Sequence, residues 1–383
     1  MPWKETRVMD QKIQMIGKWL SGEYSITELS RMYEVSRKTL YRWIERYDSD
    51  QCSGLQERSR RPLVMPRATP VEMVAEILAA KSQHEHWGSR KVLAWLSSHQ
   101  PDRRWPAAST TSEILKRHGM VHARQKRHHT PPYSQPFLKS NQPNEVWCAD
   151  FKGQFRLGGG SLCYPLTVTD SYSRYLLGCC GLAHPAYLPT RASFERTFRE
   201  YGLPMAIRTD NGVPFASVGL GGLSSLAVWF VKLGVRPERI EKAHPEQNGR
   251  HERMHRTLKA EAISPPRKSM NEQQRAFDRF RAVYNNDRPH EALGQKPPAT
   301  VYRDSTKEYT AKLPEVEYPT SFSVRQVKDN GDFKWKGTEL YLSGALAGEL
   351  IGLKQVDNDT WKIYFNFYPL GLLDERTLRI TSC

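Results

Sequence analysis

Apolar and polar positions alternate from residue 146 onwards, and short stretches rich in apolar residues follow over 164–169, 174–182 and 205–210. With 146–155, these stretches predict four β-strands in the middle of the chain. Apolar residues at helical spacing lie between them, as in 191–201. The further elements that the pattern predicts are a helix over 222–233, a strand over 235–241, a helix after Gly249 and a helix over 271–286. Strands mixed with helices in this way predict a layered α/β domain.

Residues 5–47 are predicted to form three short helices. Ser36 precedes the third of them and is expected to cap it, because a serine hydroxyl accepts a hydrogen bond from a free amide of the first turn. Leu40, Ile44 and Tyr47 then recur on the inward side of this helix. The side chains left facing outward are Arg37, Lys38, Thr39 and Arg42.

The segment 26–44 resembles a helix-turn-helix, and this resemblance implies that the outward basic side chains enter the major groove of DNA. Families of this kind usually place Gly at the turn, where this chain has Glu34. A helical bundle with a solvated basic face is the structural alternative.

A second helical region follows a basic linker. Its predicted helices cover 69–81, 89–98 and a third segment that ends at Gly119. Thr110 and Glu113 have the spacing of a capping box and are expected to begin that third helix. The region therefore also looks like a helix-turn-helix.

Beyond about residue 310 the pattern changes to short strands separated by turn residues. Turns are expected at 330–331, 336–337 and 357–359, where Asn, Asp and Gly cluster. Several short strands with regular turns predict a small all-β barrel at the end of the chain.

The chain of 383 residues has 57 Lys and Arg against 41 Asp and Glu, a net charge of +16. Residues 51–300 carry the whole excess, since 37 − 21 = +16 over that range. A basic middle region is expected if that part follows a phosphate backbone. The six cysteines contain no CxxC pair, and no apolar run is long enough to span a membrane. We therefore expect a cytoplasmic protein without membrane contacts.

Three acidic residues lie where oxygen ligands could converge. Asp150 lies in the first predicted strand, and Asp210 ends the fourth, directly before an Asn-Gly turn. Glu252 lies near the start of a predicted helix, on which Arg256 and Lys259 share its face. Carboxylates from a strand end and a helix start are a pattern by which oxygen ligands bind Mg²⁺.

The acids lie in three motifs: Trp147-x-x-Asp150, Thr209-Asp210-Asn211-Gly212 and Pro245-x-x-x-Gly249-x-x-Glu252. Together these motifs resemble the integrase core shared by retroviral integrases and many bacterial insertion-sequence transposases. Those enzymes have a ribonuclease-H-like fold and an Asp, Asp, Glu triad. The resemblance therefore implies that Asp150, Asp210 and Glu252 are the metal ligands and the catalytic residues, and that the first and fourth strands are neighbours.

Two glutamates compete for the third position of the triad. The family's usual spacing after the second Asp would select Glu246, whereas alignment through Pro245 and Gly249 selects Glu252. We choose Glu252, because it lies in the helix with basic partners while Glu246 lies in a Pro/Gly loop. The longer gap of 252 − 210 − 1 = 41 residues is then explained by an insertion in the Gly-rich segment 219–225.

The resemblance implies a polynucleotidyl transferase, a DNA transposase that uses two Mg²⁺ ions, with Mn²⁺ as a substitute. Such an enzyme nicks the 3′ ends of an insertion sequence and then joins them to target DNA. Its partners would be double-stranded DNA, at the element ends and the target, and further copies of the chain on that DNA in a bacterial nucleoid. The residues implied to hold the element end are Asn248, Arg256 and Lys259.

The expected organisation is multidomain, with an α-helical helix-turn-helix N-terminal region, an α/β ribonuclease-H-like core and a small all-β C-terminal barrel. The expected boundaries are 1–50 for the first helix-turn-helix domain, 51–130 for the second helix-turn-helix-like region with its basic linkers, 131–305 for the integrase core and 306–383 for the barrel.

Two other functions remain open from the sequence. His251-Glu252-x-x-His255 matches the zinc-metallopeptidase signature, in which two histidines one helical turn apart bind the metal. Against it, the third ligand is missing at the metzincin spacing, and Asp150 and Asp210 would have no role. A domesticated DNA-binding regulator with an inactive core is the other alternative, although it would not need an intact triad.

Overall fold

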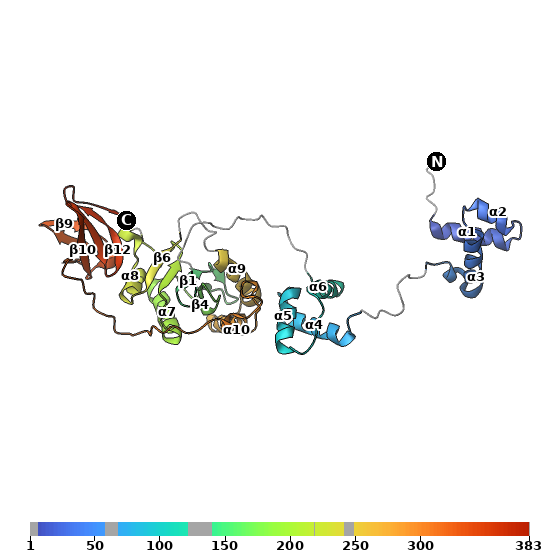
Figure 1. Cartoon of the computed structure of the whole chain (residues 1–383), viewed down its shortest axis with the longest axis horizontal. Helices are drawn as coiled ribbons and strands as arrows, with labels where there is room; N and C mark the ends of the chain where they lie inside the picture. Colours follow the sequence, from blue (N-terminus) through green and yellow to red (C-terminus); the bar gives the residue numbers. More distant parts are fainter. Residues whose placement is uncertain (1–6, 58–67, 122–139, 218, 241–248, 383) are drawn as a thin grey trace. The chain divides into compact units, whose positions relative to one another are not determined.

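The chain divides into two compact units, Met1–Ala68 and Thr69–Cys383, each of which is described by itself (Figure 1). Across the described ranges, no helix combines the length and the apolar character needed to cross a membrane. The computed structural model describes residues 7–57, 68–121, 140–217, 219–240 and 249–382.

The first unit contains three helices, α1 (Val8–Leu20), α2 (Ile26–Met32) and α3 (Arg37–Gly54), as the sequence predicts. The Ser36 hydroxyl accepts a hydrogen bond from the Thr39 amide at 3.1 Å, which confirms the predicted cap of α3.

The turn between α2 and α3 departs from the glycine usual in such turns. Glu34 has φ of +53°, which is the left-handed conformation that glycine adopts most readily. The turn geometry is therefore retained without glycine. Leu29, Leu40 and Trp43 form part of the buried core of this unit.

The next helices are α4 (Val71–Gln83), α5 (Ser89–His99) and α6 (Ala108–Arg117). The predicted capping box at Thr110 is wrong, because α6 begins two residues earlier and has no side-chain cap. Thr111, Ile114 and Leu115 form the buried stripe of α6. Gly119 has φ of +70° and ends the helix as predicted.

The second unit is built on a six-stranded sheet. β1 lies antiparallel to β3 and parallel to β5, which confirms that the predicted first and fourth strands are neighbours. β6 pairs parallel with β5, and β4 pairs antiparallel with the far edge of β3. The strands are β1 (Val146–Phe151), β2 (Phe155–Arg156), β3 (Leu162–Asp170), β4 (Leu176–Leu182), β5 (Ala206–Thr209) and β6 (Arg236–Arg239).

The predicted strand over 146–155 is interrupted after Phe151 and resumes at Phe155. Gly153 lies in the break with φ of +85°, a conformation outside the range of extended strands. Asp150 is therefore close to the end of β1 rather than in the middle of a longer strand.

Helices cover both faces of this sheet. Successive residues of a strand point to opposite faces, and Leu177 packs in one apolar cluster with α7 and α8 while Leu176 packs in another with α9 and α10. The core is therefore an α/β sheet between two helical layers (Figure 1). The helices are α7 (Tyr187–Tyr201), α8 (Ser225–Lys232), α9 (Gly249–Leu258) and α10 (Met270–Asn286), and the π-helical turn η3 (Lys259–Ile263) follows α9.

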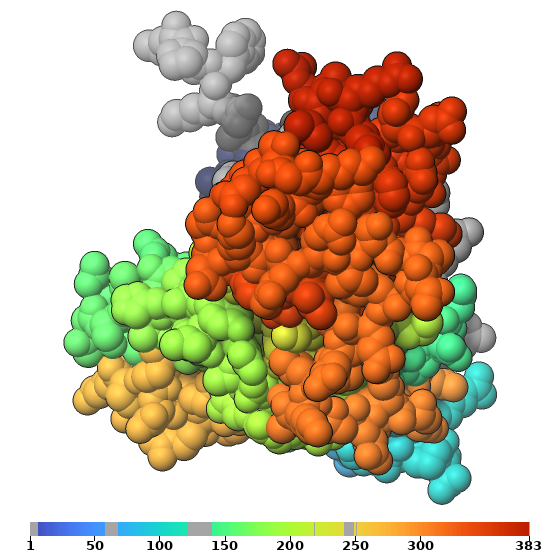
Figure 2. Space-filling view, turned by 90° about the vertical axis from the view of Figure 1, so that its left-hand side faces the viewer, coloured from blue at the N-terminus to red at the C-terminus, as the bar shows by residue number. Residues whose placement is uncertain are grey.

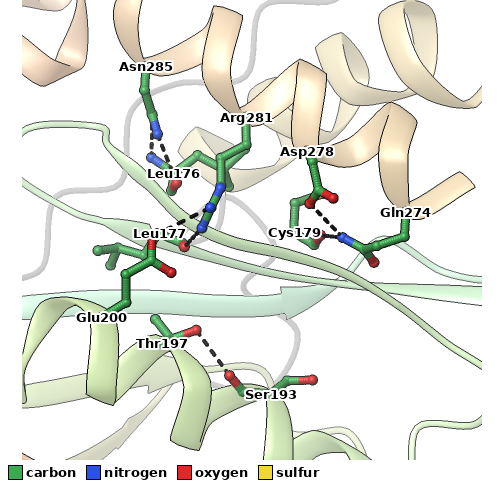
Figure 3. A network of polar contacts seen from close by, with 10 residues as sticks. All are labelled: Leu176, Leu177, Cys179, Ser193, Thr197, Glu200, Gln274, Asp278, Arg281 and Asn285. Atoms are coloured by element: carbon green, nitrogen blue, oxygen red, sulfur yellow. Dashed lines mark hydrogen bonds and ion pairs between the residues drawn. The ribbon is translucent and has the colours of Figure 1, made fainter. Parts of the chain in front are cut away.

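Side chains of α10 pair with the outer edge of β4 (Figure 3). The amide group of Asn285 accepts from the Leu176 N–H at 2.8 Å and donates to the Leu176 carbonyl at 3.0 Å. Gln274 donates to the Cys179 carbonyl and accepts from the Gly181 N–H, each at 2.9 Å. These side-chain amides make the hydrogen bonds that a further strand would make. The backbone groups that they satisfy are therefore not available for pairing with another chain.

The C-terminal region is all-β, as predicted. Five strands form one antiparallel sheet in the order β13-β12-β11-β10-β7, and β8 and β9 form a separate hairpin. Closure of these sheets into a barrel remains a prediction. The strands are β7 (Ser323–Gln326), β8 (Asp332–Trp335), β9 (Thr338–Tyr341), β10 (Leu350–Asp357), β11 (Thr360–Phe365), β12 (Tyr368–Asp374) and β13 (Arg379–Ser382).

Helix α8 belongs to two hydrophobic cores. Trp229 and Phe230 pack in the sheet cluster, whereas Val228 and Val231 pack with the C-terminal strands. An ion pair of 2.7 Å between Lys232 and Glu349 lies beside this contact. In Figure 2 the C-terminal residues, orange to red, lie against the green and yellow core.

The helix predicted over 222–233 begins only at Ser225, because the glycines before it form a short 3₁₀ turn, η1 (Leu220–Gly222). Gly221 and Gly222 both have positive φ, at +65° and +62°. Leu220 packs against the C-terminal apolar cluster. The Gly-rich segment is therefore part of the contact between the core and the C-terminal strands.

Candidate functional site

The two candidate aspartates lie side by side at the C-terminal ends of two neighbouring interior strands of the core sheet. Ala149 of β1 pairs with Thr209 of β5 in parallel register, so Asp150 and Asp210 are the next residues on neighbouring strands. The Asp150 side chain is 14% exposed. Burial raises the pKa of Asp210, although the Gly212 N–H donates to its carboxylate at 3.1 Å and opposes that shift. Two partly desolvated carboxylates therefore converge where the strands end.

Helix α9 brings two buried histidines to Asp150. The Nε2 atoms of His251 and His255 each lie 2.7 Å from the Thr167 hydroxyl on β3, and that hydroxyl is also 3.1 Å from the Asp150 carbonyl. His255 Nδ1 lies 3.9 Å from Asp150 Oδ2. Within the described part of the chain, Asp150, His251 and His255 form a group whose ligand atoms all lie within 4.8 Å of one another.

Both histidines are neutral at pH 7. Burial lowers the pKa of His251 to about 3. Burial also lowers the pKa of His255 to about 2, with smaller contributions from the nearby His251 and Lys152. Their ring nitrogens therefore act as lone-pair donors or neutral N–H groups rather than as a positive charge.

Glu252 lies in the first turn of α9 and is exposed. It precedes His255 by three residues, so the two side chains leave the helix about 60° apart. Of the three predicted metal-binding acids, Asp150 and Asp210 lie side by side on neighbouring strands. Glu252 lies on the solvent-exposed side of α9, the helix that contacts Asp150.

The contact of the two histidines with Thr167 and their position beside Asp150 were not predicted from the sequence, although the sequence contains a sign of their burial. His251, Met254, His255 and Leu258 have the i, i+3, i+4, i+7 spacing of a buried helical stripe. All four are buried. The zinc signature indicated the pair but not the strand that it faces.

Asp170, another acid at a strand end, has a structural role. Its carboxylate is 1% exposed and accepts hydrogen bonds from the amides of Asn144 and Ser173 and from the Ser173 hydroxyl, at 2.6–2.8 Å. These contacts hold the turn after β3 and leave the residue outside the candidate site.

The candidate DNA-binding residues lie on two helices. On α3, Arg37, Lys38 and Arg42 are exposed, while Thr39 is half-buried and its hydroxyl lies 2.8 Å from that of Ser36. Two others, Arg256 and Lys259, are exposed on α9 and at the start of η3. The remaining DNA-binding candidate, Asn248, falls outside the described residues, as does Glu246, the glutamate that competes with Glu252 for the third position of the triad.

Comparison with known families agrees with this geometry. Two descriptions of an integrase core domain match residues 140–245 and 233–298. A helix-turn-helix domain matches residues 11–62, and a homeodomain-like domain matches 39–115. The chain resembles insertion-sequence transposases and carries an integrase core.

Relatives of the integrase core occur in bacterial insertion elements. An uncharacterized protein of insertion element IS476 from Xanthomonas euvesicatoria is 25% identical over 251 residues, which are 64% of this chain and 69% of that protein. An uncharacterized protein of insertion element IS407 from Burkholderia multivorans is 28% identical over 180 residues, which are 47% of this chain and 62% of that protein.

Among solved structures, the HTLV-2 integrase catalytic core domain in complex with magnesium is similar at 15% identity and a TM-score of 0.35. The match covers 43% of this chain and all of that domain.

Proposed function

We propose that the chain is a DNA transposase that nicks the 3′ ends of an insertion sequence and transfers them to target DNA. The catalytic residues would be Asp150, Asp210 and Glu252. The observation that carries this proposal is the parallel pairing of β1 with β5, which puts Asp150 beside Asp210 within an integrase core. Helix α9, which carries Glu252, lies against the same strands, since His255 Nδ1 is 3.9 Å from Asp150 Oδ2.

The donor set fits a hard divalent cation. Mg²⁺ takes oxygen ligands, often one or two carboxylates together with substrate phosphates. Burial disfavours the charged form of Asp210, and a cation beside it would restore that form. When bound, a pair of such ions would activate the attacking oxygen and stabilise the leaving oxygen. We propose Mg²⁺ as the natural pair, with Mn²⁺ as a substitute.

The protein's own groups would hold the reacting parts in place. In the first step, water attacks the phosphodiester at the element end, and the leaving group is a 3′-hydroxyl. In the second, that hydroxyl attacks a target phosphodiester and releases a new 3′-hydroxyl. Asp150 and Asp210 would fix the metal ligand geometry on the sheet. Glu252 would complete it from the exposed turn of α9, where a DNA strand can approach.

Recognition of the element end would use separate surfaces. We propose that Arg37, Lys38, Thr39 and Arg42 of α3 read the DNA, since a basic helix of this kind fits the major groove. Arg256, Lys259 and Asn248 would hold the phosphate backbone near the cleavage site. Because two element ends must meet one target, we expect several copies of the chain to assemble on DNA.

The test is cleavage of DNA that bears the element's own ends, with the full chain and Mg²⁺. Asp150→Asn, Asp210→Asn and Glu252→Gln should each keep DNA binding and lose nicking and strand transfer by several powers of ten, because charge stabilisation at the phosphate has no substitute. Glu246→Gln is the matched control and should stay within about tenfold of the parent.

Other outcomes would select the alternatives. End binding without any nicking would favour a regulator with an inactive core. Activity that needs Zn²⁺, acts on peptides and disappears in His255→Ala alone would favour a metallopeptidase. An inactive Glu246→Gln beside an active Glu252→Gln would contradict the choice of the third carboxylate.

A further inference from the structure

The two buried histidines of α9 have no part in the proposed phosphoryl transfer, yet they face one of its carboxylates. We infer that Asp150, His251 and His255 form a binding site for a transition-metal ion such as Zn²⁺. A Zn²⁺ ion held there would take Asp150 away from the Mg²⁺ site. The inhibitory part of this inference rests on the proposed function, whereas the binding part does not.

The hydrogen bonds of Thr167 determine which ring nitrogens are available. Its hydroxyl contacts three groups, of which the Asp150 carbonyl can only accept a hydrogen bond. A hydroxyl has one proton, so all three contacts are hydrogen bonds only when Thr167 donates to this carbonyl and both histidines donate from Nε2. The proton of each neutral ring is then on Nε2, and each Nδ1 carries a lone pair.

This tautomer places two acceptors opposite each other. The lone pair of His255 Nδ1 faces Asp150 Oδ2 across 3.9 Å. A lone pair and a carboxylate oxygen repel each other at that separation, and a cation between them converts the repulsion into two bonds. The hydrogen bond from His255 Nε2 to Thr167 is also the outer contact by which proteins orient a metal-bound histidine.

His251 supplies the third ligand at a small cost. Its Nδ1 lies 3.3 Å from the Thr169 hydroxyl, which is beyond the usual length of such a hydrogen bond. Metal–ligand bonds of about 2.0–2.2 Å in a tetrahedral site put ligand atoms roughly 3.3–3.6 Å apart. Each residue of this group offers one ligand atom, and these atoms lie within 4.8 Å of one another, so their separations need to shrink by at most about 1.5 Å.

The donor set selects the metal. Imidazole nitrogens favour Zn²⁺, Co²⁺, Ni²⁺ and Cu²⁺, whereas Mg²⁺ prefers oxygen ligands. Two nitrogens and one carboxylate oxygen therefore favour a transition metal over Mg²⁺ at this position. Because both sites use Asp150, occupation of one excludes full occupation of the other.

The direct test measures Co²⁺ and Zn²⁺ binding to the full chain without DNA. Co²⁺ should give visible d–d absorption, and one equivalent of Zn²⁺ should displace it. His251→Asn, His255→Asn and Asp150→Asn should each lower the affinity for this first equivalent of Zn²⁺ by more than about a hundredfold. His184→Asn should leave the affinity unchanged, since His184 is an exposed histidine elsewhere. Circular dichroism of each variant verifies folding.

A thermal readout keeps the test valid if a variant is destabilised. Zn²⁺ should raise the melting temperature of the parent and of His184→Asn, but not of His255→Asn or of its bulkier partner His255→Gln. Binding that survives in both His255 variants, or that is lost in His184→Asn, would overturn the site. Absence of Co²⁺ absorption in the parent would overturn it as well.

The inhibitory part is measured separately. In Mg²⁺-dependent nicking, Zn²⁺ should inhibit the parent at lower concentration than it inhibits His251→Asn. If the protein binds Zn²⁺ but never nicks DNA, the metal site is supported and the proposed function is refuted. Equal Zn²⁺ inhibition of parent and His251→Asn would refute the shared use of Asp150.

Discussion

Replacing Asn285 by alanine would remove the side chain that pairs with the edge of β4 (Figure 3). Asn285 is 2% exposed and Leu176, whose N–H and carbonyl it satisfies, is fully buried. The two backbone groups would then have no partner and little access to water. Asn286, the next residue, is exposed and bonds only within its own helix, to the Ala282 carbonyl at 3.0 Å. Asn286→Ala is therefore a matched control.

The expected loss follows from two unpaired buried groups. Each costs about 1–3 kcal/mol, and alanine returns up to about 0.7 kcal/mol of helix propensity. The net effect of Asn285→Ala should be about 2–5 kcal/mol. At about 2–4 °C per kcal/mol for a domain of this size, the core should melt roughly 4–20 °C lower. Asn286→Ala should stay within about 0.5 kcal/mol of the parent.

Hydrogen exchange measured on peptides spanning β4 is the suitable assay, because melting of a multidomain chain is not a single two-state transition. The Leu176 amide should be well protected in the parent and in Asn286→Ala, and should exchange much faster in Asn285→Ala. Equal protection of that amide in both variants would refute the view that α10 completes the sheet edge.

Three further predictions concern recognition, pH and packing. Deleting residues 1–50 should abolish specific footprints on the element ends but leave salt-sensitive binding by the rest of the chain, and unchanged footprints would contradict this. Burial lowers the pKa of His290 to about 3, against about 6.5 in an unfolded chain. Its neutral form therefore contributes full stability above pH 6.5, and this contribution falls by about 1.4 kcal/mol per pH unit as the pH drops towards 3. His290→Asn should flatten, by that amount, the acid limb of a pH profile of the unfolding free energy measured by native-state hydrogen exchange of the core, and an unchanged slope would exclude His290 as its source. Val228→Ala should cost about 2 kcal/mol in the same assay because it removes two buried methyl groups, whereas Leu188→Ala, at an exposed position, should have little effect.

Much of the fold could be predicted from local periodicity, because each strand and helix buries one face of its own residues. The pairing of Asp150 with Asp210 came from a resemblance, since no local pattern specifies which strands become neighbours. The break after Phe151 was missed because Phe155 continues the alternation, and only the backbone of Gly153 reveals the interruption. Local alternation thus predicts which residues are extended, but not where a strand leaves the sheet.

The candidate site shows the same limit. The buried stripe that contains His251 and His255 is visible in the sequence, but the residue beneath it, Thr167, is 84 positions from His251. Contacts over such separations depend on how α9 lies across the sheet. The exposure of Glu252 likewise follows from the orientation of α9, which a helical pattern alone does not provide.

Helix α8 has apolar residues on all sides, and each side has a different partner. The ribosome completes α8 long before it synthesises β10 to β13, so the Val228 and Val231 side of the helix is left uncovered while the rest of the core can already fold. An apolar surface exposed during synthesis favours association with other chains. A protein truncated after α10 would keep that surface permanently. The C-terminal strands therefore cover an apolar surface of the integrase core that would otherwise be exposed.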